Sequence, residues 1–239
     1  MKILVSGTKS GLGKYIFNEI GTHRYKRNVN LNLYNKIKWD LIIHCGFYIG
    51  DDKFKNIENI YHSYVLSNLQ AKRFIFISSL IVYENKTNKK ENEKLNISNK
   101  NSLYCNSKIL CESFYQKKNA LILRLGTLIG KDMRKNNVNK VIKDKKPTLT
   151  LSKKSFYTFV DYSEVLEFIN LSLRKKINGI YNFNRNDSIK LEKISKLLKK
   201  EFKYGKYHFK CILAPNKKIN KIYNLDKIRS FDILRKYLS

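Results

Sequence analysis

The sequence has little proline and no flexible linker. Pro147 and Pro215 are the only prolines among 239 residues, and no stretch is rich in glycine and serine. Such a chain suits one large domain or two small ones, with no break in composition between them. The four cysteines show neither metal-ligand spacing nor a disulfide framework, so we expect free thiols in a reducing cytoplasm and no metal site. They are Cys45, Cys105, Cys111 and Cys211.

Long apolar runs are also absent. The longest apolar stretch near an expected strand, residues 41–50, is too short to cross a bilayer, which takes about 20 residues. The first residues lead directly into a glycine-rich turn, unlike a signal peptide. These features predict a cytoplasmic protein that does not contact a membrane.

Acidic residues are scarce: 19 Asp and Glu stand against 49 Lys and Arg, a formal net charge of +30. Nucleic-acid binding is one interpretation of this excess. However, only nine of the 49 cations are arginine, which is better suited than lysine to bidentate contacts with phosphates and bases. Lysine is spread along the whole chain among many asparagines and isoleucines. We therefore interpret the charge as a solvated basic surface and regard nucleic acid as an unlikely partner.

The sequence does contain a regular alternation of short apolar runs and amphipathic stretches. The expected strands are 2–6, 40–45, 73–78 and 120–125, and the expected helices are 11–20, 53–70 and 102–118. Because these strands are apolar on both faces and spaced for βαβ units, they predict an α/β fold with a Rossmann-type doubly wound parallel sheet. Beyond residue 125 the pattern predicts a small mixed α/β region. Its expected strands are 148–151, 155–160, 179–183 and 207–213, and its expected helices are 163–174 and 188–202.

A glycine-rich turn follows the first strand, with the spacing G-x-x-x-G-x-G. Gly7 allows a tight turn, Gly11 lets backbone N–H groups approach a pyrophosphate, and Gly13 lets the helix pack close to the strand. The N-terminus of that helix presents the positive end of its dipole. The turn therefore predicts a dinucleotide site. Its residues are Gly7, Lys9, Ser10, Gly11, Leu12 and Gly13.

The region after this helix lacks the acid that NAD sites use to hold the ribose hydroxyls. No carboxylate occurs from Ile20 to Trp39. The same stretch carries several cations, and Arg24 or Arg27 suits the 2′-phosphate of NADP, as does Lys9 in the glycine turn. The sequence thus favours NADP(H), with NAD(H) as the alternative.

Tyr104 and Lys108 are four residues apart on an expected helix and therefore share one face. An ammonium beside a phenol favours the phenolate, so such a tyrosine suits proton exchange with a hydroxyl or carbonyl during hydride transfer. The same spacing occurs at Tyr34/Lys38 and Tyr223/Lys227. Only the pair at 104 and 108 follows a strand that ends in hydroxyls, where Ser79 is expected to hydrogen-bond the same substrate oxygen.

With these motifs the chain resembles the extended branch of the short-chain dehydrogenase/reductase superfamily, which contains NAD(P)-dependent nucleotide-sugar epimerases, dehydratases and ketoreductases. Residues 78–83 (SSLIVY) resemble its S-S-x-x-V-Y-G, with Glu84 where glycine is usual. Residues 41–46 (LIIHCG) resemble its h-h-H-x-A-A. Residues 123–130 (LRLGTLIG) resemble its L-R-P-x-x-x-h-G, without the proline. Two C-terminal segments are similar as well, FVDYSEV at 159–165 and NLDKIR at 224–229.

The resemblance implies a catalytic set of Ser79, Tyr104 and Lys108, with Asn56 as the family's structural asparagine. It implies an NAD(P)-binding domain at 1–130 and a small substrate-binding region, interleaved with it, at 131–239. Further cofactor contacts are implied for Cys45, Gly46, Lys108, Gly126 and Thr127. Only residues 21–39 separate the first helix from the strand at 40–45. We therefore expect one strand–helix unit of the family to be trimmed where adenosine would sit.

The choice of reaction depends on small differences within this resemblance. Dehydratases of the branch carry an acidic pair just after the catalytic hydroxyl, where this chain has Leu80 and Ile81. The basic cluster suits an exchangeable NADPH, so the sequence favours reduction of a 4-keto nucleotide sugar. An epimerase with retained NAD(P) is the alternative. Lys131 and Arg134, in the loop after Gly130, are the candidates for the substrate diphosphate.

Two further expectations concern partners. Helices 53–70 and 102–118 lie where this superfamily often dimerises, so a homodimer is possible. The basic surface also leaves open a non-catalytic member of the fold that senses NADP or associates with RNA.

Overall fold

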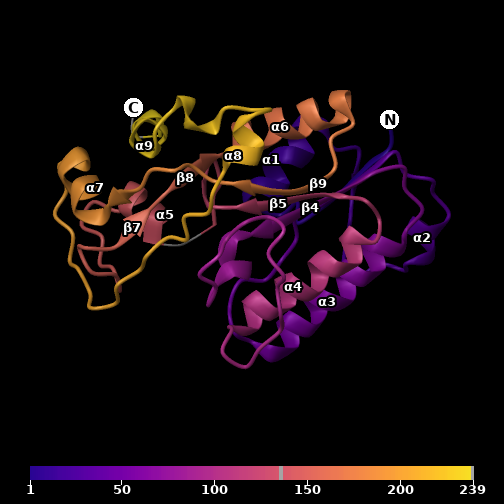
Figure 1. Ribbon diagram of the computed structural model, residues 1–239, viewed down its shortest axis with the longest axis horizontal. Coiled ribbons are helices and arrows are strands. Elements are labelled where there is room, and N and C mark those ends of the chain that lie inside the picture. Colours follow the sequence, from indigo (N-terminus) through magenta and orange to yellow (C-terminus); the bar gives the residue numbers. More distant parts are fainter. Residues whose placement is uncertain (135–136, 238–239) are drawn as a thin grey trace.

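A six-stranded parallel sheet forms the centre of the protein, as the sequence predicts (Figure 1). The computed structural model describes residues 1–134 and 137–237. The strand order is β2-β1-β3-β4-β5-β9. The strands are β1 (Ile3–Ser6), β2 (His23–Arg24), β3 (Leu41–His44), β4 (Phe74–Ser79), β5 (Leu121–Leu125) and β9 (Gly179–Phe183). Every residue of β1, β3 and β5 is buried, which explains their continuous Ile, Leu and Val runs.

Helices cover both faces of this sheet, so successive strand residues enter two different apolar cores. Ile3 and Val5 face α1 (Gly11–Ile20) and α6 (Tyr162–Lys175), whereas Leu4 faces α3 (Lys53–Asn68) and α4 (Leu103–Gln116). Figure 1 shows α3 and α4 side by side below the sheet, and α1 and α6 above it. The short helices α2 (Asn32–Asn35) and α8 (Lys217–Asn220) complete these layers.

The strand–helix unit between α1 and β3 is present but short, as expected for a trimmed unit, since it consists of β2 and the four-residue α2. In the described residues, β2 is an edge strand of two residues and no strand lies beyond it. On its other side β1 pairs directly with β3, with Ser6 opposite His44. The chain turns to opposite faces after β1 and β3, so their carboxyl ends flank the crevice in which open α/β sheets bind ligands.

The chain after β5 builds a smaller lobe with its own apolar cluster. Its elements are β6 (Thr127–Ile129), α5 (Asn137–Lys143), β7 (Phe156–Tyr157), β8 (Phe159–Asp161), β10 (Ile189–Lys190), α7 (Leu191–Leu198) and α9 (Ser230–Lys236). β6 pairs with β8, and β7 pairs with β10. Strand β9 and helix α6, which also come after residue 130, belong instead to the main sheet and its covering layer.

Several expectations for this lobe were wrong. The strands expected at 148–151 and 207–213 form only isolated bridges, among them Leu151 with Tyr207. The helix expected at 188–202 covers only Leu191–Leu198, because residues 189–190 extend as β10 and Lys199 adopts a left-handed conformation. These segments pair across long sequence distances, which local periodicity does not report. No helix in residues 1–134 or 137–237 is long and apolar enough to span a membrane.

Candidate active site

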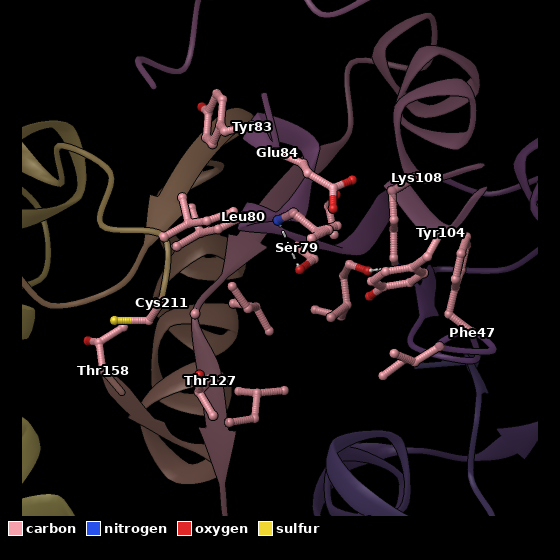
Figure 2. Close-up of a pocket in the computed structure, with 18 of the residues that line it drawn as sticks. Phe47, Ser79, Leu80, Tyr83, Glu84, Tyr104, Lys108, Thr127, Thr158 and Cys211 are labelled. Carbon is pink, nitrogen blue, oxygen red and sulfur yellow. Dashed lines mark hydrogen bonds between the residues drawn. The ribbon is translucent and has the colours of Figure 1, made fainter. Parts of the chain in front are cut away.

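A cavity of about 740 Å³ lies at the carboxyl ends of β3, β4 and β5 and reaches the start of α1. It joins the predicted glycine turn to the predicted catalytic residues. The predicted residues that line it are Ser10, Gly11, Leu12, Gly13, Cys45, Ser79, Tyr104, Lys108, Gly126, Thr127 and Arg134. Figure 2 shows Ser79 between Tyr104 and Lys108 on one side and Thr127 and Cys211 on the other.

The glycine turn brings the ends of β1 and β3 into direct contact. A Cβ atom on Gly7, whose φ is +74°, would lie 2.7 Å from the backbone N of Gly46. A Cβ on Gly13 would lie 2.5 Å from the carbonyl oxygen of Gly7. The Ser6 Oγ atom accepts hydrogen bonds from the N–H groups of Cys45 and Gly46 at 3.1 and 2.9 Å. Gly7, Gly13 and Gly46 are therefore required by packing, and Gly11 faces the cavity.

Tyr104 lies in the first turn of α4, where its ring packs edge-on against Phe47. Burial raises the pKa of Tyr104 to about 12, while a hydrogen bond with Ser79 and the charge of Arg134 act in the opposite direction. The phenol is therefore protonated at neutral pH. Ser79 ends β4, and its Oγ accepts the Ile81 N–H at 3.2 Å, which orients this hydroxyl at the cavity wall.

Lys108 lies one turn after Tyr104 and is almost fully buried. Its Nζ donates a 2.7 Å hydrogen bond to the Ile77 carbonyl and lies 3.7 Å from the centroid of the Phe47 ring. The Tyr104 ring centroid is 6.0 Å away. Burial lowers the pKa of Lys108 to about 7, so its charge changes near neutral pH.

Asn56 does not line the cavity but connects the two helices below it. Its Nδ2 donates to the carbonyls of Gly50 and Asp52, and its Oδ1 accepts the Ser107 hydroxyl at 2.9 Å. Ser107 immediately precedes Lys108, so Asn56 connects the start of α3 to the part of α4 that carries Tyr104 and Lys108.

The Glu84 side chain also holds the start of α4, and its role was not predicted from the sequence. The Glu84 carboxylate accepts both the Ser102 N–H at 2.8 Å and the Ser102 Oγ–H at 2.7 Å. Ser102 in turn caps α4 by accepting the Cys105 N–H. Among the described residues that line the cavity, Glu84 is the only acid. The one feature of the sequence that could have indicated this role is that Glu84 stands where the motif S-S-x-x-V-Y-G has glycine.

A buried ion pair lies beneath β4, the strand that carries Ser79. The sequence did not predict this pair. Arg124 and Glu112 are each 1% exposed and form a bidentate contact, with Nη2–Oε2 and Nε–Oε1 distances of 2.7 and 3.0 Å. The Ser78 hydroxyl donates to Glu112 at 2.6 Å, and Arg124 also donates to the Tyr83 hydroxyl. Burial alone would lower the pKa of Arg124, but the Glu112 carboxylate raises it overall. The segment around Ser79 therefore rests on a fixed charged pair.

The predicted 2′-phosphate residues do not line the cavity. Arg24 stacks on the Phe17 ring of α1 at 4.3 Å, and the Arg27 guanidinium lies 3.5 Å from Glu58. Lys9 is exposed. Lys9 lies in the loop after β1, Arg24 ends β2 and Arg27 follows that strand. His44 is buried between Tyr115 and the Gly46 carbonyl, and burial lowers its pKa to about 3, so it stays neutral.

On the substrate side, Lys131 is exposed and outside the cavity lining, whereas Arg134 reaches back toward the glycine turn. The opposite wall comes from a segment that was predicted only as a strand. Tyr207, Phe209, Lys210, Cys211 and Ile212 line the cavity there. Their position depends on long-range pairing, including the bridge between Phe156 and Lys210.

Comparisons with known proteins agree with this geometry at the level of the fold. No protein-family model and no curated protein sequence matches the chain. Among solved structures, an NAD-dependent NDP-hexosamine 5,6-dehydratase involved in tunicamycin biosynthesis aligns with a TM-score of 0.80 at 12% identity, over 99% of this chain and 96% of that one. UDP-N-acetylglucosamine 4-epimerase from Bacillus cereus aligns with a TM-score of 0.74 at 16% identity, over 100% and 98% of the two chains. The dTDP-4-dehydrorhamnose reductase from Bacillus anthracis, solved with NADP, gives 0.76 at 14% identity over 99% of each.

These structures define the class of fold. The chain has a Rossmann-like fold that it shares with solved NAD(P)-dependent nucleotide-sugar dehydratases, epimerases and reductases, which confirms the fold that the sequence resemblance implies. The three reactions share this architecture, so the fold does not select among them.

The residues present fit a dinucleotide. Gly11 lines the cavity with a φ of +61°, and a Cβ built on it would lie 3.2 Å from the Tyr162 hydroxyl and 3.7 Å from Cγ of Arg134. The same cavity continues without interruption to Tyr104 and Lys108. The cavity thus connects the predicted diphosphate site to the predicted catalytic residues.

Proposed function

We propose that this protein is an NADPH-dependent oxidoreductase that reduces a 4-keto sugar carried on a nucleoside diphosphate. One observation supports this most strongly: the glycine turn, Ser79, Tyr104 and Lys108 all face one cavity. A bound reduced nicotinamide would supply the hydride in this reaction. The chain's own residues would bind the sugar, orient its carbonyl and deliver the proton.

Tyr104 is the proposed proton donor. Its pKa of about 12 keeps the phenol protonated before the reaction, which suits protonation of a carbonyl oxygen as that oxygen gains negative charge. The Ser79 hydroxyl would hydrogen-bond the same oxygen and hold it against the phenol. Lys108, in its charged form, would favour the phenolate left after proton transfer.

Charge in the cavity supports a substrate with a diphosphate group. Besides Lys108 and Arg134, the cavity is lined by Lys86, Lys89 and Lys210. Tyr207 and Phe209 lie next to Lys210 and offer ring faces for a nucleobase. We propose that Lys86, Lys89 and Lys210 with these two rings, more than the exposed Lys131, bind the nucleotide half of the substrate.

NADP(H) remains the proposed cofactor, with Arg24, Arg27 and Lys9 as the cations for its 2′-phosphate. The support is electrostatic: Arg24 ends β2, Arg27 follows it, and the sequence from 20 to 39 has no carboxylate. NAD(H) is the alternative.

An epimerase with retained cofactor is the second candidate, and one observation favours it. The backbone N–H of Gly11 is hydrogen-bonded to the carbonyl of Asp132 at 3.0 Å. A loop that closes against the glycine turn in this way would slow cofactor exchange, which suits an enzyme that reuses one bound cofactor.

The surface supports a homodimer through α3 and α4. Phe54, Ile57, Tyr61 and Tyr64 form an exposed apolar stripe along α3, each more than half exposed. Residues 56–71 contain no Lys or Arg, although 49 of 239 residues are cations. In a chain of net charge +30, such a face is where two copies approach with least repulsion.

The first experiment is a thermal-shift titration of the purified protein with NADPH, NADP⁺, NADH and NAD⁺. Ligands that bind the folded state raise the midpoint, so we expect the largest shift with the phosphorylated pair. A shift with the non-phosphorylated pair alone would favour the epimerase. If no nucleotide shifts the midpoint and the denatured protein releases none, the oxidoreductase proposal is wrong.

The second experiment tests the catalytic assignment with Tyr104→Phe. On a substrate that the native protein turns over, this variant should lose at least about 100-fold in kcat while its NADPH affinity stays within about twofold. Full activity of the variant would show that Tyr104 is not the proton donor.

A further inference from the structure

Residues 130–134, which we term the bridging segment, connect two sides of the proposed cofactor crevice. On one side, the Asp132 carbonyl accepts the Gly11 N–H at 3.0 Å, and the Asp132 carboxylate pairs with Lys14 of α1 at 2.6 Å. On the other side, Nη1 of Arg134 donates to the carbonyl of Phe47, after β3, at 2.8 Å. The segment therefore spans from the start of α1 to the loop after β3.

The path of this segment is fixed by close packing. A Cβ on Gly130 would lie only 2.1 Å from Cδ2 of Tyr162, so the backbone runs directly over that ring. The Tyr162 hydroxyl is 3.2 Å from where a Cβ on Gly11 would stand. Asp132 has a φ of +58°, which few residues other than glycine adopt. Close packing against Tyr162 thus holds the bridging segment against the glycine turn.

This location coincides with the switch point of the sheet. The crevice between the ends of β1 and β3 is where an open α/β sheet binds a dinucleotide, with the diphosphate at the start of the first helix. Arg134 lines the cavity at this point, and its Cγ is 3.7 Å from where a Cβ on Gly11 would stand. A diphosphate at the glycine turn would therefore lie beside Arg134.

The charge of Arg134 acts on the interior of the cavity. It opposes the effect of burial, which raises the pKa values of both Tyr104 and Cys45. No carboxylate in the described residues lies within ion-pair distance of its guanidinium, whose protein partner is the neutral Phe47 carbonyl. A guanidinium held by a neutral acceptor at an anion site gains a stronger, charge-assisted pair when a phosphate arrives.

We propose that Arg134 binds the diphosphate of the dinucleotide cofactor, and that the bridging segment must release Gly11 before this cofactor enters. This inference rests on the proposed function and changes one assignment, because the sequence favoured Arg134 as a ligand of the substrate diphosphate. Gly11 gives its N–H to a phosphate oxygen in place of Asp132, and the Lys14–Asp132 ion pair holds the segment closed. Entry and release of the cofactor then share one opening step.

Equilibrium binding of cofactor fragments tests the role of Arg134. NADPH, ADP and adenosine are titrated into the full-length protein and into Arg134→Gln, which keeps a hydrogen-bond donor and loses the charge. Arg235→Gln, an exposed arginine of α9, is the matched control. We expect Arg134→Gln to weaken NADPH and ADP about 10- to 100-fold, as for loss of a charge-assisted hydrogen bond, and to change adenosine by less than twofold. Equal weakening of adenosine, or no effect on ADP, overturns the assignment.

Dissociation kinetics test the opening step. Lys14→Met removes the ion pair that holds Asp132, and Lys196→Met, which removes an exposed ion pair of α7, is its control. Release of NADPH is followed by its fluorescence after mixing with excess NADP⁺. We expect both association and dissociation to become at least about fivefold faster in Lys14→Met, with Kd changed by less than threefold. Unchanged rates would show that the segment does not limit exchange.

The two levels of proposal fail in different ways. If the native protein binds no dinucleotide, the proposed oxidoreductase function is wrong. If the native protein binds NADPH and Arg134→Gln binds it equally well, only the inference about Arg134 is wrong. A native dissociation rate slower than turnover would also show that the cofactor is retained, which would favour the epimerase over the reductase.

Discussion

The ammonium of Lys108 lies 3.7 Å from the centroid of the Phe47 ring, over its face, at the wall of the cavity. This contact and the hydrogen bond to the Ile77 carbonyl partly replace the water that burial removes. They do not replace it fully, since burial still lowers the pKa of Lys108 to about 7. The residue that should promote proton transfer by Tyr104 is therefore only partly charged at neutral pH.

This low pKa predicts a pH-dependent effect of Lys108→Met on stability. The pKa is about 7 in the folded protein and 10.5 in the unfolded chain. Between these pH values the unfolded chain binds more protons than the folded protein does. The contribution of Lys108 to the free energy of unfolding therefore increases as pH rises. The free energy of unfolding changes by an amount on the order of 3–5 kcal/mol between these two pKa values. We expect Lys108→Met to be most stabilising, relative to native protein, near pH 6 and least so near pH 9.5.

The measurement is the difference in Tm between variant and native protein across this pH range. Loss of the hydrogen bond to Ile77 shifts all values by a constant, so only the slope matters. Lys193→Met on α7, an exposed site, should give a flat difference. A flat difference for Lys108→Met as well would mean that its pKa is close to that of a free lysine.

The pair of Glu112 and Arg124 predicts strongly non-additive mutations. Because both side chains are 1% exposed, Glu112→Met leaves a buried guanidinium without its counter-charge. This should cost about 3–5 kcal/mol of unfolding free energy. The double variant Glu112→Met/Arg124→Met removes both charges and should be more stable than Glu112→Met alone. Urea denaturation followed by circular dichroism measures the native protein, both single variants and the double variant, and simple additivity would contradict the expected coupling.

Glu84 is expected to position Tyr104 through the start of α4. Glu84→Ala removes the acceptor for the Ser102 N–H and hydroxyl, whereas Glu84→Gln keeps an oxygen acceptor. We expect Glu84→Ala to lose about 0.5–2 kcal/mol of stability, as for loss of a helix cap, and to lower kcat with little change in NADPH affinity. Glu84→Gln should recover most of both losses. Equal kcat values for native protein and Glu84→Ala would show that the contact does not position Tyr104.

The sequence was most informative where function depends on local pattern. The glycine turn, the hydroxyls at the end of β4 and the spacing of Tyr104 and Lys108 are all local, and the structure brings them to one cavity. The parallel sheet followed from strands that are apolar on both faces, because such strands need helices on both sides.

The sequence was least informative where distant segments meet. The wall that includes Cys211 depends on isolated bridges between residues more than 50 positions apart. The contact of Asp132 with Gly11 joins positions 121 residues apart through a backbone carbonyl, which has no signature in residue types. The sequence predicted that Arg134 binds a diphosphate on the substrate. Its position beside Gly11 instead led us to propose the diphosphate of the cofactor.

The apolar stripe of α3 leads to a prediction about assembly. Ile57 and Tyr61 are each 52% exposed at the centre of the stripe, and Tyr64 packs edge-on against Phe114 of α4. If two copies meet through this face, Tyr61→Lys places a cation at the centre of the apolar stripe and opposes association through burial and repulsion. We expect native protein to sediment as a dimer at micromolar concentration and Tyr61→Lys to sediment as a monomer. The Tm of Tyr61→Lys should be close to that of native protein when the two samples contain the same concentration of monomer. Leu33→Lys on α2, 58% exposed outside the stripe, is the control and should remain dimeric. Sedimentation equilibrium separates the cases, because a monomeric native protein would contradict the dimer, and loss of the dimer in both variants would place the contact elsewhere.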